Sequence, residues 1–252
     1  MLTYDKPGGG KVAPASVKRD LTIMKAMIGH AIREFDLIKT AHNPFEALEV
    51  GSSSGGEDDV AARELKETLP DSVVTAMKDK LQGELQLIWG ILDGTGCRLA
   101  EISGLCRDDV CDIDGPIPHL IIRPNAIRRL KNTSSRRSVP LFGDALRATV
   151  EALSRSAPAD YLFPRYARPN GPTALSAIFM KHLRGFTSDK RHTTHSLRHN
   201  MKDKLRRAGV DKAGQDLVLG HASQSVGEGY GGAEGRLDAA YRALKGVYEG
   251  SD

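Results

Sequence analysis

The stretch GSSSGGEDD at residues 51–59 constrains the fold of this 252-residue chain more than any other feature. Glycine and serine keep a chain flexible, so this segment indicates a linker. Before it, residues 1–15 are rich in Gly and Pro and are expected to be disordered. Apolar residues at helical spacing then predict one amphipathic helix from Val17 to Ile38. We therefore expect a short N-terminal part at residues 1–50 and a main domain at residues 60–252.

The single helix before the linker cannot bury its own apolar face. It must either pack on the main domain or be the remnant of a larger N-terminal domain, and the residues alone leave both readings open. The main domain is long enough to bury a sizeable core without disulfides or metals.

The main domain is predicted to be mainly helical with one small antiparallel sheet, an α+β fold. Gly and Pro divide the helical segments, and the turn-rich DGP and KNTSS stretches separate short β-like runs. The predicted helices are Val60–Leu69, Asp71–Leu92, Arg98–Leu105, Asp144–Leu153, Pro172–Phe186, His195–Ala208, Asp211–Leu219 and Leu237–Tyr248. The predicted strands are Val110–Ile113, His119–Arg123 and Arg136–Leu141.

Composition excludes several classes of protein. The chain is 40% hydrophobic and 27% charged, which is typical of soluble globular proteins. No apolar run approaches the roughly 20 residues that span a bilayer, and no signal peptide is visible at Met1. The three cysteines, Cys97, Cys106 and Cys111, lack CxxC spacing, which indicates reduced thiols in a cytoplasmic protein.

The net charge of +4 is modest, but basic residues are grouped. The segment 115–143 holds no Asp or Glu, and Lys and Arg outnumber acidic residues between Lys181 and Lys212. Such blocks fit a surface with one positive face, as binding to a phosphate backbone requires. Solvated helix faces with unsorted signs would give the same counts, so charge alone does not decide.

The segment HTTHSLRHN contains a histidine and an arginine that can share one ligand. His195 and Arg198 are three residues apart, which places them on one helix face. An arginine fork suits phosphate oxygens, and histidine exchanges protons near neutral pH. Zinc ligation by His192, His195 and His199 is disfavoured because no HExxH motif or intervening carboxylate is present and Arg198 adds positive charge.

Two further basic residues stand in suggestive places. Arg98 follows a glycine break in TGCRLAEISGL, with Glu101 three residues on to orient a neighbouring side chain. Alone, this pair is also an ordinary intrahelical ion pair. Lys131 enters a predicted β-hairpin, RRLKNTSSRRSVPL, from which a lysine can reach a DNA groove or simply face solvent. No P-loop, GxGxxG or GxSxG motif is present.

The stretch VLGHASQSVGEGYGG places a tyrosine where a core can hardly form. Tyr230 follows His221 by nine residues in a glycine-rich, polar segment. This chain thereby resembles the tyrosine recombinases, the phage integrase family, over roughly residues 60–250. Four ordered segments carry the resemblance: TGCR, the lysine hairpin, HSLRH, and LGH with its tyrosine.

The resemblance implies a mechanism of DNA strand cleavage and rejoining. Tyr230 would attack a DNA phosphate and form a 3′-phosphotyrosyl bond, with Lys131 as general acid for the 5′-oxygen. Arg98 and Arg198 would neutralise the transition state, while His195 and His221 would bind the phosphate or assist proton transfer. Glu101 would support the site. Further DNA contacts are predicted, from the basic block, at Arg128, Arg129, Arg136 and Arg137.

The resemblance also implies partners and surroundings. No metal or other cofactor is expected, and double-stranded DNA is the expected partner, with a homotetramer on DNA and a monomer without it. The expected location is the bacterial cytoplasm at the nucleoid, and the expected source is a prophage or other mobile element. A topoisomerase IB-like relaxing activity, or a DNA-binding remnant without catalysis, stands as the alternative. The last helix could dock on a neighbouring copy or pack within its own chain, and Val17–Ile38 resembles the last helix of a mostly missing core-binding domain.

Overall fold

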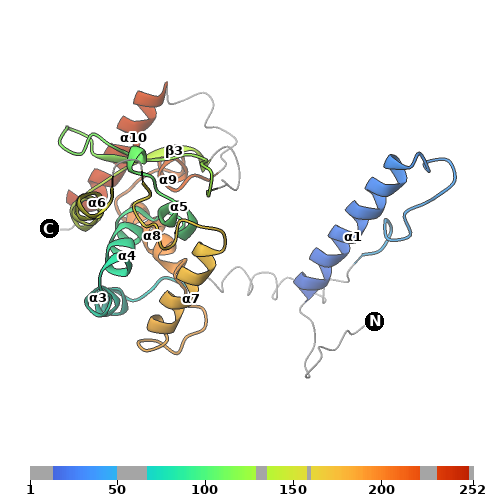
Figure 1. The fold of residues 1–252 in the computed structure, drawn as a ribbon, viewed down its shortest axis with the longest axis horizontal. Coiled ribbons are helices and arrows are strands. Elements are labelled where there is room, and N and C mark those ends of the chain that lie inside the picture. Colours follow the sequence, from blue (N-terminus) through green and yellow to red (C-terminus); the bar gives the residue numbers. More distant parts are fainter. Residues whose placement is uncertain (1–13, 50–66, 129–134, 158–159, 222–231, 250–252) are drawn as a thin grey trace. The chain divides into compact units, whose positions relative to one another are not determined.

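The structure is a computed structural model that describes residues 14–49, 67–128, 135–157, 160–221 and 232–249. The chain divides into two compact units, Met1–Glu64 and Leu65–Asp252 (Figure 1). Within the described ranges, no helix is long and apolar enough to cross a membrane.

The first unit is built around α1, Pro14–Glu34. The segment after the helix returns along it: Lys25 Nζ donates to the Glu46 carbonyl and Asn43 Nδ2 donates to the Lys25 carbonyl, both at 2.9 Å. The helix ends before the predicted Ile38, because Asp36 adopts a left-handed φ of 52°. No residue described in this unit is buried, so its described part has no core of its own. That it is the remnant of a larger domain stays a prediction.

The second unit combines helices with one small sheet, which confirms the predicted fold class (Figure 1). Its strands are β1 (Val110–Cys111), β2 (His119–Ile122) and β3 (Arg137–Pro140), with a 3₁₀ turn at Arg107–Asp109. Its helices are α3 (Asp71–Lys80), α4 (Glu84–Thr95), α5 (Leu99–Ser103), α6 (Gly143–Arg155), α7 (Gly171–Leu183), α8 (Ser196–Arg207), α9 (Lys212–Leu219) and α10 (Ala233–Glu249).

Helix α4 lies at the centre of this unit. It packs against α3, α5, α6 and α8, and its residues 87–92 are all buried. Trp89 meets Phe179 of α7 with ring centroids 5.5 Å apart. Nearly every side of α4 is apolar or small, as expected of a helix that neighbours enclose on all sides.

The three strands form an antiparallel sheet in the order β1-β2-β3. Leu120 of β2 stands opposite both Val110 and Val139, so one line of apolar side chains crosses the sheet. Helices α9 and α10 pack against β3. The sheet thus brings β3 close to the end of α9, which matters for the site described below.

Several element boundaries differ from the predictions. The predicted helix Asp71–Leu92 is two helices, because Leu81 is extended and Gly83 has a φ of +59°. The last residues of the predicted helix Val60–Leu69, 67–69, are not helical, while the rest lie outside the described ranges. Arg98 and His195 are N-cap residues rather than the first helical residues of α5 and α8.

Helix α10 packs within its own chain. It contacts β3, α8 and α9, and it buries Ala240 and Leu244. At its end, the Tyr248 ring stacks on Phe142 with centroids 5.2 Å apart, and its hydroxyl donates to the Gly94 carbonyl at 2.8 Å. In this single chain the helix packs on its own domain, and its docking on a neighbouring copy stays a prediction.

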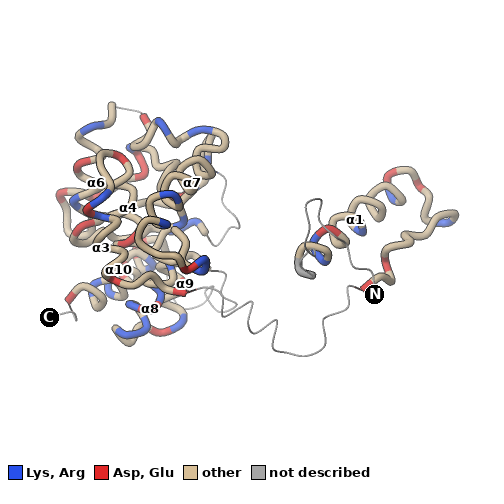
Figure 2. The backbone as a smooth tube through the Cα atoms, turned by 90° about the horizontal axis from the view of Figure 1, so that it is seen from below, with Lys and Arg blue, Asp and Glu red and all other residues tan. Residues whose placement is uncertain are grey.

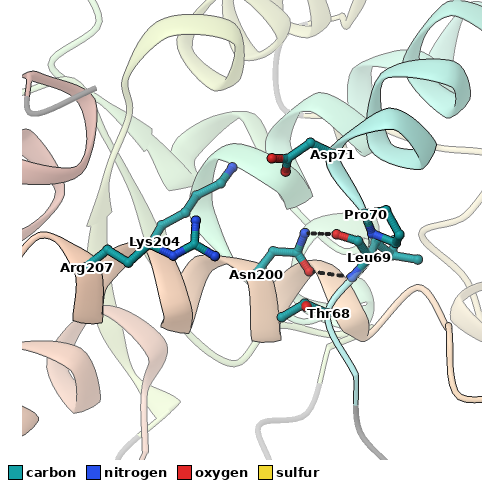
Figure 3. Close-up of a pocket in the computed structure, with 7 residues that line it drawn as sticks. All are labelled: Thr68, Leu69, Pro70, Asp71, Asn200, Lys204 and Arg207. Carbon is teal, nitrogen blue, oxygen red and sulfur yellow. Dashed lines mark hydrogen bonds between the residues drawn. The ribbon is translucent and has the colours of Figure 1, made fainter. Parts of the chain in front are cut away.

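The segment that leads into α3 is fastened to α8 by one side chain (Figure 3). Asn200 Nδ2 donates to the Leu69 carbonyl, and Asn200 Oδ1 accepts from the Leu69 amide, both at 2.7 Å. The amide group thereby mimics a strand partner. A pocket of about 180 Å³ opens beside this contact, and its other lining residues are Thr68, Pro70, Asp71, Lys204 and Arg207. None of the predicted catalytic residues that the structure describes lines it.

Gly96, the C-cap of α4, gives a first testable prediction. Its φ is +63°, and a Cβ there would lie 2.7 Å from Met201 Cβ and 3.0 Å from Leu219 Cδ2. We expect Gly96→Ala to lower the free energy of unfolding by about 3 kcal/mol in urea denaturation, from left-handed strain plus steric overlap. Gly83→Ala is the matched control: its φ is +59°, but nothing lies within 4 Å of the added Cβ. We expect it to cost only about 1 kcal/mol, and equal losses would refute the packing argument.

Candidate active site

Four predicted site residues from three separate parts of the chain come together at the ends of α4 and α9. Arg98 and Glu101 lie at the start of α5, directly after α4. Arg198 lies on α8, and His221 follows Gly220, the C-cap of α9. The contacts among these elements, described next, form one cluster.

Both arginines are held by carbonyl oxygens at helix C-termini. Arg98 Nη2 donates to the Gly220 carbonyl at 3.2 Å, and Arg198 Nη2 donates to the neighbouring Leu219 carbonyl. Arg198 Nη1 donates to the carbonyl of Gly96 at 2.9 Å. Gly96 and Gly220 both end their helices in the left-handed conformation. Such C-caps leave carbonyls free at the negative end of the helix dipole, where guanidinium groups are stabilised.

Glu101 fixes Arg98 from the other side. Its carboxylate accepts from the Arg98 backbone amide at 2.8 Å and from Arg98 Nη1 at 2.7 Å, so a side chain in the first turn of α5 satisfies the amide of its N-cap residue. Only 3% of Glu101 is exposed. Burial by itself would raise the pKa of this carboxyl, but contacts with Arg137 and Arg98 hold the pKa at about 2. Glu101 is therefore a buried anion that orients Arg98.

The site retains positive charge in spite of Glu101. Burial, and then the nearby charges of Arg98 and Arg137, lower the pKa of Arg198 to about 10. Arg198 stays protonated at neutral pH, but its charge is not fully compensated. A bound anion between Arg98 and Arg198 would relieve this repulsion. The cluster therefore favours a negatively charged ligand.

His221 supplies a neutral imidazole at the edge of the cluster. Its Nδ1 lies 3.3 Å from Asp216 Oδ1. Burial and the charge of Arg198 lower the pKa of His221, with Asp216 opposing. The ring is thus neutral at physiological pH. A proton on Nδ1 donated to Asp216 leaves the lone pair on Nε2, which can accept a hydrogen bond or a proton.

His195 is the exposed member of the HxxR pair. It caps the N-terminus of α8, and its ring meets His199 edge-on with centroids 5.1 Å apart. Its carbonyl accepts from the Arg198 amide at 3.1 Å, so the two residues share the first turn of α8 as predicted. His192 belongs to a different cluster, since its Nδ1 lies 2.8 Å from Thr187 Oγ1. The group of possible metal ligands found among the described residues is Glu67, Asp189 and His192, and both carboxylates pair with Arg191.

Three predicted residues, Arg129, Lys131 and Tyr230, lie outside the described residues. Their predicted roles therefore stay predictions. Ser135 Oγ, four residues beyond Lys131, accepts from Arg98 Nη1 at 3.3 Å.

Two of the predicted DNA contacts are corrected. Arg128 and Arg137 are 3% and 8% exposed, and both donate to buried carboxylates. Arg128 Nη2 pairs with Asp109 at 3.0 Å, and Arg137 Nη2 pairs with Glu101 at 3.0 Å. Both charges are therefore neutralised by buried carboxylates and serve the scaffold, unlike that of Arg198, which is equally buried at 4% exposed but is held by carbonyls. Arg136 is exposed and stays a candidate contact. Helix α8 also carries basic residues, which colour parts of its tube blue in Figure 2. Lys202, Arg206 and Arg207 follow Arg198 in its sequence.

Sequence reasoning missed two features that support the site. It did not single out Asp216, and it did not predict that Arg137 is buried. Arg137 and Val139 are two apart in a strand, so they share one face, and Val139 is fully buried. The alternation of the strand could therefore have indicated that Arg137 faces the core. Asp216 precedes His221 by five residues across a helix end, and no spacing rule singles it out.

The buried ionisation of Glu101 predicts a specific pH dependence. Its pKa is about 2 in the folded protein against an ordinary 4.5, so the carboxylate stabilises the fold above pH 4.5. This stabilisation is lost as pH falls from 4.5 through about 2. We expect Glu101→Gln to cost about 3 kcal/mol at pH 7, and the gap to wild type to shrink on acidification in chemical denaturation. Glu151→Gln is the control, because Glu151 is an exposed residue of α6. We expect it to change the free energy of unfolding by under about 0.5 kcal/mol. A gap independent of pH would contradict the assignment.

Known proteins share this sequence pattern and fold. A sequence model of the phage integrase family matches residues 65–231. Tyrosine recombinase XerD of Corynebacterium glutamicum is 29% identical over 147 residues, 56% of this chain and 45% of that protein. The chain thus spans less than half the length of this curated relative.

Solved structures agree in fold. The integrase of transposon Tn1549, in complex with a circular intermediate DNA, matches with a TM-score of 0.58 and 18% identity, over 96% of this chain and 80% of that one. A lambda integrase tetramer bound to a Holliday junction matches with a TM-score of 0.58 and 16% identity, over 86% and 62%. The family match covers well over half of the chain and includes both the arginine cluster and the segment of the predicted nucleophile. The chain therefore belongs to the phage integrase family, the tyrosine recombinases.

Proposed function

We propose that the chain is a site-specific DNA recombinase that cleaves and rejoins strands through a covalent bond between Tyr230 and a DNA 3′-phosphate. One observation carries the proposal. Arg98 and Arg198 come from different elements, are held by backbone carbonyls at 3.2 Å and 2.9 Å, and share a positive charge that is not fully compensated beside neutral His221. A phosphodiester in transfer needs this arrangement of fixed donors and charge.

The arginines have donors to spare for a phosphate. In their contacts with described residues, Arg98 uses both Nη1 protons and one Nη2 proton. Arg198 uses one proton on each Nη. Each guanidinium has five N–H groups, so Arg98 retains Nε–H and one Nη2–H, and Arg198 retains three. Both can therefore bind non-bridging oxygens without giving up the contacts that orient them.

The proposed reaction is a reversible transesterification. The Tyr230 oxygen attacks the phosphorus as its proton passes to a base, for which neutral His221 is the candidate. The bond from phosphorus to the 5′-oxygen breaks, and Lys131 gives that oxygen its proton. The new phosphotyrosyl ester conserves the bond energy, so a second 5′-hydroxyl can reverse the step on another strand without a nucleotide cofactor. His195, three residues before Arg198 at the start of α8, is the candidate for a further contact with the same phosphate.

The proposed assembly follows from the reaction. Exchange between two duplexes needs four strand cleavages, so we propose four copies on DNA, as in the lambda integrase tetramer bound to a Holliday junction. The substrate is double-stranded DNA of a mobile element at the bacterial nucleoid. The first unit, with α1 exposed, acts as the end of a core-binding domain.

Replacement of the nucleophile tests the proposal. A pool of nicked duplexes of random sequence is incubated with the protein, and DNA that stays attached in SDS is recovered and sequenced. We expect wild type to form this adduct and Tyr230→Phe to form none, because the attacking oxygen is gone. Tyr241→Phe is the matched control, since Tyr241 packs on Phe142 at 5.2 Å in α10. An adduct from Tyr230→Phe would refute the nucleophile.

Arg198 gives an independent prediction. We expect Arg198→Ala to slow cleavage of the recovered sequence by about 10³-fold or more, because a fixed donor to the transition state is lost. Arg206→Ala on the same helix is the control, because Arg206 is exposed and pairs with Asp203. Rates are taken from single-turnover adduct formation at saturating protein. A rate for Arg198→Ala within tenfold of wild type would remove Arg198 from the reaction.

A further inference from the structure

Arg137 lies beneath the cluster with every donor engaged. Its Nε donates to the Val218 carbonyl at 2.8 Å, and its Nη1 donates to Glu101 Oε1 at 3.1 Å and to the Ser135 carbonyl at 3.0 Å. Its Nη2 donates to Glu101 Oε2 at 3.0 Å and to Cys97 Sγ at 3.4 Å. These five contacts use all five N–H groups of a guanidinium. Arg137 therefore has no donor for a phosphate, unlike Arg98 and Arg198.

Arg137 and Arg98 share the same carboxylate. Glu101 Oε1 accepts from both arginines, at 2.7 Å from Arg98 and 3.1 Å from Arg137. The three side chains carry two positive charges and one negative charge, a net of +1. Without Arg137 the remaining pair would be neutral, and Glu101 would bind Arg98 alone. Because Arg137 also pairs with the Glu101 carboxylate, Glu101 does not fully neutralise Arg98, and the charge on Arg98 stays available to a ligand.

Arg137 also supports the turn that holds both arginines. Val218, which it binds, directly precedes Leu219 and Gly220, whose carbonyls accept from Arg198 and Arg98. Gly220 lies close against the guanidinium: a Cβ there would be 2.8 Å from Arg137 Nη1 and 3.1 Å from Cζ. One buried side chain therefore supports the turn whose carbonyls accept from both Arg98 and Arg198.

We propose that Arg137 is a positioning residue for strand cleavage, which keeps Arg98 aligned and charged by sharing Glu101 and by supporting the turn at Val218–Gly220. This inference rests on the proposed function. It assigns Arg137 no contact with DNA, and its effect passes through Arg98.

A neutral substrate separates this role from general destabilisation. We would compare cleavage of the recovered sequence with that of the same duplex carrying a methylphosphonate at the scissile position. Methyl in place of a non-bridging oxygen removes the charge that the arginines neutralise. We expect Arg137→Gln to cleave the natural phosphate about 10²-fold more slowly than wild type. On the methylphosphonate we expect the two to agree within about tenfold, as for Arg98→Ala.

A double variant tests the shared carboxylate. Glu101→Gln with Arg137→Gln restores the net charge of +1, because both buried partners become neutral amides that can bind each other. We expect it to cleave at least about tenfold faster than Arg137→Gln alone. Arg137→Lys keeps the charge but loses the fork, and we expect a smaller deficit than for Arg137→Gln. If Arg137→Gln folds poorly, the double variant and Arg137→Lys are compared with wild type instead.

Arg128→Gln is the matched control. Arg128 is equally buried and pairs with Asp109 at 3.0 Å, but it touches neither Arg98 nor the Glu101 carboxylate. We expect its deficit to be the same on both substrates. Wild type is assayed first, so failure of the proposed function appears as no adduct from any variant. The inference itself is overturned if Arg137→Gln cleaves the natural phosphate within threefold of wild type. It is also overturned if the deficit of Arg137→Gln is equal on both substrates, or if the double variant cleaves no faster than Arg137→Gln.

Discussion

The carboxylate of Glu101 is the contact on which the rest of the site depends. Removing a charge from water costs several kcal/mol unless partners replace the lost hydration. Here Arg98 and Arg137 donate to both oxygens, and the Arg98 amide completes the shell. The same bonds start α5, tie β3 to it and aim Arg98. One buried anion therefore couples the sheet, a helix start and Arg98, the arginine proposed to bind the phosphate.

The two arginines proposed to bind the phosphate, Arg98 and Arg198, are oriented largely by backbone rather than by side chains. Arg198 is held at Gly96 O and Leu219 O, and Arg98 at Gly220 O. Backbone carbonyls at glycine C-caps accept hydrogen bonds without adding a full negative charge. The arginines are thus aligned but not neutralised, which suits a ligand that brings its own charge. A site lined with more carboxylates would hold the arginines equally well and bind phosphate poorly.

The buried pair Arg128–Asp109 performs a similar task at the base of the hairpin. Arg128 also donates to the Arg123 and Glu101 carbonyls at 2.8 Å, and Asn125 Oδ1 accepts from the Arg128 amide at 2.7 Å. These bonds fasten the chain that leaves β2 toward Lys131. Arg198 is as buried as Arg128 and Arg137, at 4% exposed, so burial does not separate the arginines. Arg128 and Arg137 pair with buried carboxylates in the scaffold, while Arg98 and Arg198 keep N–H donors for the proposed substrate.

The sequence by itself determined the order of elements, the fold class and the cluster of Arg98, Glu101, Arg198 and His221. Helical and strand periodicity, glycine breaks and the order of motifs are properties of the linear sequence, so a single sequence is enough to recognise them. Only the tertiary structure decided which basic residues face outward. Arg136 and Arg137 are neighbours in the same basic block, yet one is exposed and the other buried. Alternation along β3 separates them, but the buried face is set by the packing of α9 and α10 on that strand. Asp216 likewise became a partner of His221 only through the turn at Gly220, because no local pattern fixes a contact across a helix end.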